Sequence, residues 1–257
     1  MTGPSPHPSQ HSLADSRFGS VGARYVNSAV HASGADLDRI AARAAAARPA
    51  RALDLGAGGG HVGYAIAPHA GSVVACDLSA AMLEQVEAEA VRRVLGNIET
   101  TTAPAEARPF ADGAFDLRAC RFSTHHWRDA LGGLREARRV LQRGAPATFV
   151  DVVAPGPAPA DTHLQAVELL RDPSHVRDYS AAQWLTMLEL AGFAVEAVVP
   201  SRLRMDFADW TDRMRTSAAN RAAIRALQAD APREVADHFA IEPDGSFTID
   251  VLLIEAR

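Results

Sequence analysis

A glycine-rich turn directly after a short apolar strand is the feature that most restricts the fold of this chain. The turn, Asp54-Leu-Gly-Ala-Gly-Gly-Gly-His61, overlaps the end of the apolar stretch 51–55, and a helical pattern follows it. Glycines at such a place let the backbone turn sharply and let a ligand approach where a Cβ would clash. The segment therefore predicts a strand, turn and helix with a ligand at the carboxyl end of the strand.

An acidic residue at the end of the next predicted strand points to the same kind of ligand. Asp77 follows the strand 72–76 and lies 23 positions after Asp54. A carboxylate about 20 residues beyond a glycine turn accepts hydrogen bonds from ribose hydroxyls in dinucleotide folds. The turn and Asp77 together predict an adenosine-type ligand.

Predicted strands and helices alternate over most of the chain. Strands are expected over residues 51–55, 72–76, 97–102, 115–122, 148–153, 193–199 and 247–254. Helices are expected after Ser79, over 129–142, and after Ser180, which forms a capping box with Gln183. This order predicts an α/β fold, a doubly wound Rossmann-like sheet with helices on both faces.

Segments without a place in the sheet are interpreted as additions around one domain. Residues 1–16 are rich in Pro, Ser, His and Gly and are expected to form a disordered tail. Residues 17–257 are expected to form a single domain. Within it, 17–47 are expected to form an N-terminal helical lid, and 155–178 and 205–238 to form helical caps over the site.

Composition excludes several classes of protein. The net charge is −5 and all 26 basic residues are Arg, which argues against a nucleic-acid backbone as partner. No apolar run reaches the roughly 18 to 20 residues that a membrane span needs. Two cysteines exclude a disulfide framework, and the histidine spacing favours no metal site. A cytoplasmic location is expected.

The glycine turn alone leaves the ligand open. Residues 58–63 fit the dinucleotide pattern G-x-G-x-x-G, and the turn could also serve only tight packing. However, Asp54 lies just before Gly56, and a carboxylate there is a poor neighbour for a pyrophosphate. It suits a cationic ligand better.

Several motifs in order resemble the class I S-adenosylmethionine-dependent methyltransferases, in particular the group with the ubiquinone/menaquinone-biosynthesis C-methyltransferases (methyltransferase type 11). These are LDLGAGGG at 53–60, VVACDLSAAML at 73–83, AEARPFADGAFD at 105–116, RFSTHHWRD at 121–129 and LREARRVLQRG at 134–144. The resemblance implies the seven-stranded sheet of that class and S-adenosyl-L-methionine as cofactor.

The resemblance also implies roles for individual residues. Asp54 and the turn (Gly56, Ala57, Gly58 and Gly60) would hold the methionyl part of the cofactor, and Asp77 the ribose hydroxyls. Adenine would lie against Leu78 and Met82 with Ala105 and Glu106 at its edge, and Arg121 would lie near the methionyl group. One departure is Pro104, where the family often has an acidic residue that accepts from the adenine amino group.

Two histidines after the fourth strand are the candidates for catalysis. Methyl transfer mainly requires alignment and exclusion of water, and a His can take the proton that a neutral acceptor loses. His126 is preferred over His125 because it falls where the family carries a His beside cofactor and acceptor. The alternative, in which one or both only hydrogen-bond the loop or pack against Trp127, stays open. In the N-terminal helix, Tyr25 and His31 share a face with Ser28 and are expected to line the site.

The sequence thus predicts methyl transfer from S-adenosylmethionine to a small organic acceptor, of which an aromatic or quinol-like molecule is one candidate. Two alternatives stay open. A nicotinamide-dependent oxidoreductase would lack the Lys of a Tyr-Lys proton-donor pair, because the chain has no Lys. A non-catalytic protein that binds S-adenosylmethionine would keep the same pocket. The sequence does not indicate the oligomeric state.

Overall fold

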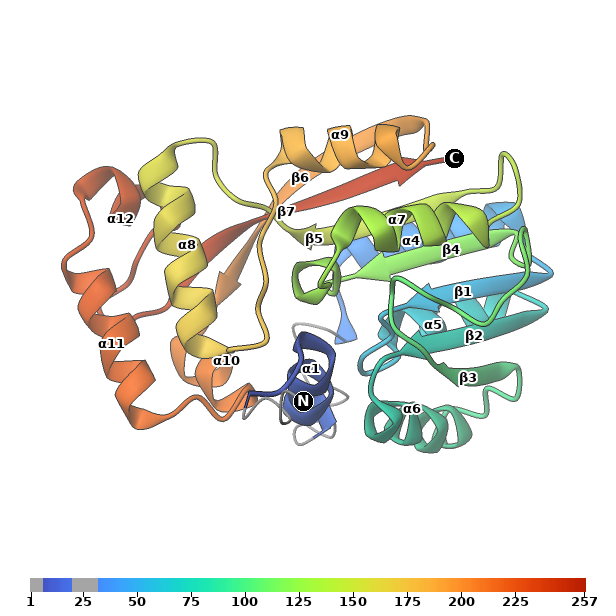
Figure 1. The fold of residues 1–257 in the computed structure, drawn as a ribbon, viewed down its shortest axis with the longest axis horizontal. Coiled ribbons are helices and arrows are strands. Elements are labelled where there is room, and N and C mark those ends of the chain that lie inside the picture. Colours follow the sequence, from blue (N-terminus) through green and yellow to red (C-terminus); the bar gives the residue numbers. More distant parts are fainter. Residues whose placement is uncertain (1–6, 20–31) are drawn as a thin grey trace, which may run out of the picture.

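Seven strands form one continuous sheet in the computed structural model, which describes residues 7–19 and 32–257. The strand order is β3-β2-β1-β4-β5-β7-β6 (Figure 1). Strands β1 to β5 are parallel, whereas β7 runs antiparallel to both β5 and β6. The predicted doubly wound, seven-stranded α/β architecture is confirmed, with one antiparallel strand that the alternating pattern did not indicate.

All seven expected strands are present. They are β1 (Arg51–Leu55), β2 (Ser72–Asp77), β3 (Ile98–Thr102), β4 (Leu117–Arg121), β5 (Ala147–Val152), β6 (Val195–Met205) and β7 (Phe247–Ala256). The central strands are buried on both faces, as parallel strands between two helical layers must be. Strand β6 is longer than expected because its second half continues to pair with β7 beyond the rest of the sheet.

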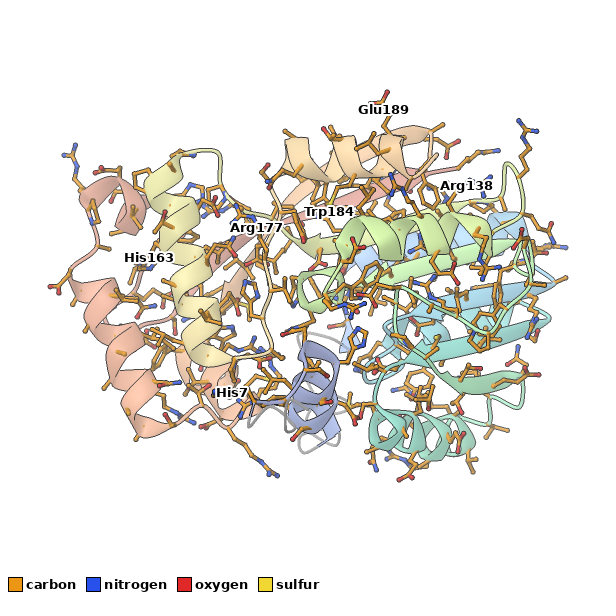
Figure 2. The ribbon with its side chains drawn as sticks, viewed as in Figure 1. His7, Arg138, His163, Arg177, Trp184 and Glu189 are labelled. Carbon is orange, nitrogen blue, oxygen red and sulfur yellow. The ribbon has the colours of Figure 1, made fainter. Side chains whose placement is uncertain are left out.

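Helices cover both faces of the sheet. On one face lie α4 (Ala35–Ala47), α5 (His61–Ile66) and α6 (Ala80–Arg92), which pack on one another and on the sheet through two apolar clusters. On the other face lie α7 (Ala130–Arg139) and α9 (Ala181–Leu190). The capping box of Ser180 and Gln183 at the start of α9 is confirmed. Figure 2 shows Trp184 between α9 and the strands, where it is buried.

The two segments expected as caps form a helical group beyond the long ends of β6 and β7 (Figure 1). It consists of α8 (Ala158–Arg171), α10 (Phe207–Arg213), α11 (Ala218–Ala229) and α12 (Arg233–Phe239). Large apolar side chains of these segments, such as Trp210 of α10 and Met205 at the end of β6, are buried in the core cluster of the first face. They therefore stabilise this group and do not form a wall for a ligand.

The N-terminal part differs from the sequence prediction. Residues 10–16, expected as part of a disordered tail, lie in helix α1 (Gln10–Gly19), which packs against α6. Conversely, α4 belongs to the expected lid but packs its Leu37 and Ile40 into the core under the sheet. Polarity misled the prediction of the tail, because contacts with distant loops rather than apolar burial hold α1 in place.

None of the helices within residues 7–19 and 32–257 is long and apolar enough to cross a membrane.

Candidate functional site

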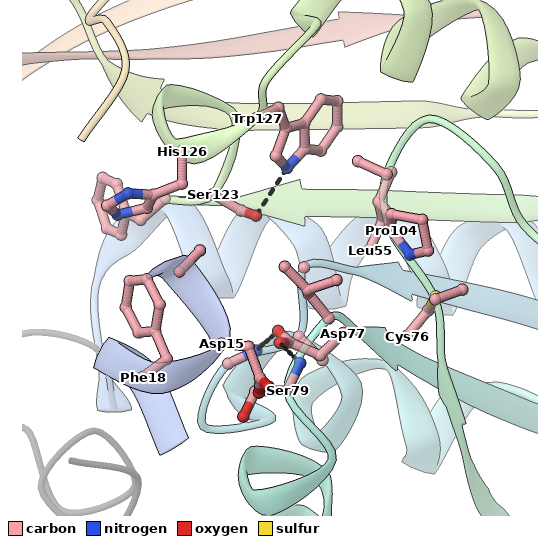
Figure 3. Close-up of a pocket in the computed structure, with 18 of the residues that line it drawn as sticks. Asp15, Phe18, Leu55, Cys76, Asp77, Ser79, Pro104, Ser123, His126 and Trp127 are labelled. Atoms are coloured by element: carbon pink, nitrogen blue, oxygen red, sulfur yellow. Dashed lines mark hydrogen bonds between the residues drawn. The ribbon is translucent and has the colours of Figure 1, made fainter. Parts of the chain in front are cut away.

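A pocket lies at the carboxyl ends of β1, β2 and β4, between these strands and α1 (Figure 3). It holds about 1010 Å³ of space between atoms, measured out to its mouth. Its wall combines the glycine turn after β1, the end of β2, the loop after β3, the end of β4 and one face of α1. The sheet therefore brings together residues from 11 to 127 at one edge, which is where ligands bind in open α/β sheets.

The glycine turn forms the floor of this pocket, as expected. Gly56, Ala57 and Gly58 line it, and Gly56 has φ +66°. A Cβ on Gly56 would lie 1.9 Å from the Ser123 hydroxyl, so the turn and the end of β4 approach too closely for any side chain. Gly60, also expected at the ligand, instead starts α5 with φ +80° and does not line the pocket.

Asp77 fastens the turn to the end of β2. Its two carboxylate oxygens accept hydrogen bonds from Gly58 N at 2.8 Å and Ser79 N at 2.9 Å, shown by the dashed lines of Figure 3. Burial raises the pKa of Asp77, and the backbone hydrogen bonds oppose that shift. Each oxygen keeps a lone pair for a further donor, which suits the hydroxyl pair of a ribose.

Asp54 lies behind the turn and not on the pocket wall. It is 1% exposed, and its Oδ2 accepts a hydrogen bond from Gly63 N at 2.8 Å. Its Oδ1 is buried without a partner, and burial raises the pKa of the carboxyl to about 7. The expected direct contact with a methionyl group is thus replaced by a role one layer deeper, where Asp54 fixes the start of α5.

The end of the pocket expected to take adenine contains most of the residues assigned to it. Leu78, Ala105 and Glu106 line the pocket, together with Cys76 and Pro104. The Glu106 carboxylate already accepts from Asp129 N at 3.0 Å and lies 3.2 Å from the His11 ring. Met82, in contrast, is fully buried beneath the turn and does not reach the pocket.

Helix α1 forms the outer wall, which the sequence analysis missed. His11, Ala14, Asp15 and Phe18 all line the pocket. They follow an i, i+3, i+4, i+7 pattern, so they share one helical face. This spacing is the signal in the sequence that could have indicated the helix, although the segment has few apolar residues.

The end of β4 contributes Arg121 and a strained residue. Arg121 lines the pocket while its Nε and Nη2 donate to Asp36 at 2.5 and 3.3 Å. Phe122 follows with φ +52°, a conformation that a bulky side chain rarely adopts. Phe122 is one of the residues that line the pocket, and its side chain also packs against the core cluster of the first face and beneath the Arg121 guanidinium.

The two candidate catalytic histidines have different environments. His126 lines the pocket, and the Phe18 ring contacts it edge-on at a centroid distance of 4.8 Å. His125 does not line the pocket, because its Nδ1 turns inward to Asp151 Oδ1 at 2.5 Å. Adjacent residues point in different directions, so only His126 can contact a ligand in this pocket.

The charges of the two histidines also differ. Although burial opposes it, the Asp151 carboxylate raises the pKa of His125 to about 9, so His125 is an imidazolium at neutral pH. Burial and the neighbouring His125 charge lower the pKa of His126 to about 4, so His126 is neutral. A neutral imidazole on the wall can accept a proton.

Tyr25 and His31 lie outside the described residues, so their expected place at the site remains a prediction. Among residues 7–19 and 32–257, no group of three or more His, Cys, Asp or Glu side chains is arranged to hold a metal ion.

Comparison with known proteins identifies the family. Residues 53–149 match the methyltransferase domain family. The uncharacterized methyltransferase YcgJ of Bacillus subtilis is 30% identical over 90% of this chain and 93% of its own length. The chain belongs to the class I S-adenosylmethionine-dependent methyltransferases.

Other similar proteins agree with this family. The uncharacterized protein YafE of Escherichia coli is 43% identical over 76% of this chain and 94% of its own length. The crystal structure of a putative methyltransferase from Bacillus halodurans matches with a TM-score of 0.83 at 33% identity, over 87% of this chain and 99% of that one.

Membership of the family decides between the main alternatives. The protein is a methyltransferase and S-adenosylmethionine is its methyl donor, so the nicotinamide-dependent oxidoreductase is excluded. The residues of the pocket fit this cofactor. Backbone atoms of Gly56 and Gly58 contribute to the floor, and the partly buried Asp77 carboxylate, whose oxygens keep spare lone pairs, lies beside it.

Proposed function

We propose that this methyltransferase methylates a small, neutral organic acceptor of the phenol or quinol type in the cytoplasm, with His126 taking the acceptor's proton. One observation carries the proposal: a neutral imidazole shares a pocket wall with the glycine turn and Asp77. A group that binds the donor and a group that accepts a proton thus face the same space.

The cofactor occupies the part of the pocket that backbone atoms build. Gly56, Ala57 and Gly58 lie along its methionyl part, and Asp77 accepts from the ribose hydroxyls. Leu78 and Ala105 enclose adenine, with Glu106 at its edge. Arg121, held by Asp36, lies near the methionyl end. The bound cofactor supplies an electrophilic methyl group on a sulfonium.

The acceptor occupies the part of the pocket that aromatic side chains build. Phe18, Phe122 and Trp127 line this part beside His126. Apart from histidines and the residues assigned to the cofactor, Asp15 on α1 is the charged side chain among the described residues of the wall. An acidic wall disfavours anionic acceptors, and flat aromatic walls favour planar ones.

The chain's own residues then have three tasks. The walls align the acceptor oxygen or carbon with the methyl group for an in-line displacement. Helix α1 covers the pocket and keeps water out. His126 takes the proton that the acceptor loses. General-base catalysis of this kind contributes about 10²- to 10⁴-fold to a reaction rate.

The cytoplasmic location has one structural support. Cys76 and Cys120 are both free and buried, and free thiols are usual in a reducing compartment.

The test combines binding and mass measurements. Calorimetry with S-adenosylhomocysteine should give a dissociation constant in the micromolar range or below for the wild type and for His126→Asn. Incubation with S-adenosylmethionine and a panel of phenols, quinols and amines should add one methyl group to a phenol or quinol. His126→Asn should slow that transfer by ~100-fold.

A histidine in the cap helices provides the matched control. His163 lies on α8 against Phe239, and His163→Asn should transfer methyl groups at the wild-type rate. Methylation of amines alone would overturn the proposed acceptor class. Unchanged transfer by His126→Asn would overturn the role of His126, and no transfer to any acceptor despite tight binding would favour a non-catalytic binding protein.

A further inference from the structure

A loop from the cap region holds the candidate base. Residues 172–175 follow α8, and Ser174 reaches His126 across 48 positions of sequence. His126 Nδ1 lies 3.2 Å from the Ser174 carbonyl oxygen and 3.4 Å from its hydroxyl oxygen. The Ser174 hydroxyl donates in turn to Asp172 Oδ1 at 2.8 Å. Asp172, Ser174 and His126 thus form a connected series.

This series decides which nitrogen of His126 carries the hydrogen. A carbonyl oxygen can only accept, and the Ser174 hydroxyl already donates its hydrogen to Asp172. Nδ1 must therefore be the donor, and Nε2 carries the lone pair. None of the described residues forms a hydrogen bond with Nε2. The nitrogen able to take a proton is the one that no protein group among them occupies.

Several elements that pack against His126 carry charged or titratable side chains near its ring. The His125 imidazolium lies at a ring centroid distance of 4.2 Å and is itself paired with Asp151 of β5. His175 is at 6.4 Å, and burial keeps it neutral by lowering its pKa to about 4. Arg171 of α8 also disfavours a charge on His126, whereas Asp172 favours one.

Asp172 remains ionised in this setting. It is fully buried, and burial raises its pKa; the imidazolium form of His126, the hydrogen bonds from Ser174 and the Arg171 guanidinium lower that pKa below its usual range. Arg17 of α1 lies 3.6 Å from its Oδ1. Its Oδ2 is buried and has no hydrogen-bond partner. A buried carboxylate with an open lone pair is costly unless a positive charge appears beside it.

We propose that Asp172 is a positioning residue for His126. Through Ser174 it fixes the imidazole with Nε2 as the basic atom, and its carboxylate stabilises the imidazolium that forms there. This inference rests on the proposed function. The acceptor's O–H bond breaks and its proton moves to Nε2, while the oxygen forms a bond to the methyl group and the bond between that methyl group and the donor's sulfur breaks, which leaves neutral S-adenosylhomocysteine. One positive charge therefore leaves the donor's sulfur and appears beside Asp172.

The proposal is tested first without any acceptor, by NMR of protein labelled with ¹⁵N-histidine. The wild type should show His126 protonated at Nδ1. Asp172→Asn keeps an oxygen for the Ser174 donors but removes the charge, so it should lower the pKa of His126 by about one unit. His125→Gln removes the opposing positive charge and should raise the pKa of His126 by a similar amount.

A neighbouring carboxylate serves as control. Asp161 lies on α8, where it pairs with Arg177, and Asp161→Asn should leave the pKa and the tautomer of His126 unchanged. If Asp172→Asn does not fold, Ser174→Ala carries the test, because it breaks the link to Asp172 and should also lower the pKa of His126. An unchanged or raised value in either variant, or hydrogen on Nε2 in the wild type, overturns the proposal.

Kinetics separate this inference from the proposed function. With the best acceptor of the panel, Asp172→Asn should reduce kcat at least ~10-fold, while KM and the affinity for S-adenosylhomocysteine change less than ~2-fold. Asp172→Glu, which restores the charge, should recover part of kcat. If His126→Asn loses activity but Asp172→Asn does not, only this inference fails. If His126→Asn keeps full activity, the proposed base itself is wrong.

Discussion

The two ends of the pocket are built in opposite ways. At the cofactor end, backbone atoms of neighbouring segments make the wall, and Asp77 is bonded to two backbone N–H groups. At the acceptor end, side chains make the wall, and Asp151 of β5 holds Thr124 and His125 while Ser174 of the loop after α8 holds His126. Positive φ angles are on glycines at the first end and on Phe122 at the second.

This difference separates the part proposed to bind the cofactor from the part proposed to bind the acceptor. The turn tolerates little variation at Gly56, because its close approach to Ser123 leaves no room for a side chain. A side-chain wall can change its residues without changing the fold. Among the described residues, the buried Asp172 Oδ2 has no hydrogen-bond partner, and it lies at this end, close to His126. An unpaired buried oxygen of this kind suits the charge that we propose appears on His126 during the reaction.

The largest effect should come from filling the close approach at the cofactor end. Gly56→Ala places a Cβ 1.9 Å from the Ser123 hydroxyl and puts an alanine at φ +66°. We expect the free energy of unfolding to fall by about 4 kcal/mol, since overpacking costs ~1 to 3 and the left-handed conformation ~1 to 2. Urea denaturation measures the loss, and calorimetry should show S-adenosylhomocysteine binding at least ~10-fold weaker.

Gly96→Ala is the control for this substitution. A Cβ at Gly96 meets nothing within 4 Å, so stability and binding should stay near wild type. If Gly56→Ala bound the cofactor product normally, the close packing of the turn against β4 would not be a requirement of the site.

The next effect concerns pH and the acceptor end. The pKa of His125 is raised from 6.5 to about 9 in the folded protein, so its stabilisation is complete below about pH 6.5 and is lost as the pH rises through 9. A shift of this size corresponds to about 3 kcal/mol. Urea denaturation at pH 6, 7.5 and 9.5 should show the stability difference between wild type and His125→Gln shrinking by about that amount.

A constant difference between wild type and His125→Gln over this range would show that His125 carries no charge in the folded protein. His126 would then lack the neighbour that holds it neutral, and the electrostatic contrast between the two histidines would disappear.

A smaller effect should follow from weakening Asp77. Asp77→Asn keeps only one acceptor oxygen, where Gly58 N and Ser79 N now have two. The substitution also removes the negative charge that strengthens hydrogen bonds from hydroxyl donors. Hydrogen bonds to charged groups are worth ~1.5 to 3 kcal/mol, so calorimetry should show S-adenosylhomocysteine binding at least ~10-fold weaker.

Asp116 offers a matched control at the opposite edge of the sheet. Its carboxylate also accepts from two backbone N–H groups, Ala50 N and Arg51 N, at 2.8 and 2.9 Å. Asp116→Asn should destabilise the protein to a similar degree and leave binding intact. Equal loss of binding in both variants would mean that Asp77 acts through stability alone.

The smallest effect tests the strain at Phe122. Glycine adopts φ +52° without cost and alanine does not, so Phe122→Gly should be more stable than Phe122→Ala by about 1 kcal/mol. Both variants remove the ring, so both should lose methyl transfer to aromatic acceptors to a similar degree. Denaturation and transfer assays check these points, and an alanine variant at least as stable as the glycine variant would show that the backbone relaxes without the ring.

Much of the fold and of the cofactor end was predictable, because the determinants are local. The turn at 54–61 and Asp77 lie within two consecutive strands, and their spacing follows from the length of one strand–helix–strand unit. Asp54 and Met82 were expected to contact the ligand, but both side chains lie beneath the residues that line the pocket. Sequence spacing identifies the strand end on which a side chain sits, but not whether another backbone segment covers it.

The sequence by itself determined the order of strands and helices, the turn that opens the pocket and the carboxylate at its edge, because alternating apolar segments and glycines act within a few residues. Only the tertiary structure decided that α1 covers the pocket, that His125 turns away to Asp151, and that Asp172 and Ser174 hold His126. These contacts join segments up to 164 positions apart, as between Gln10 and Ser174, and no local pattern specifies which distant polar groups will meet.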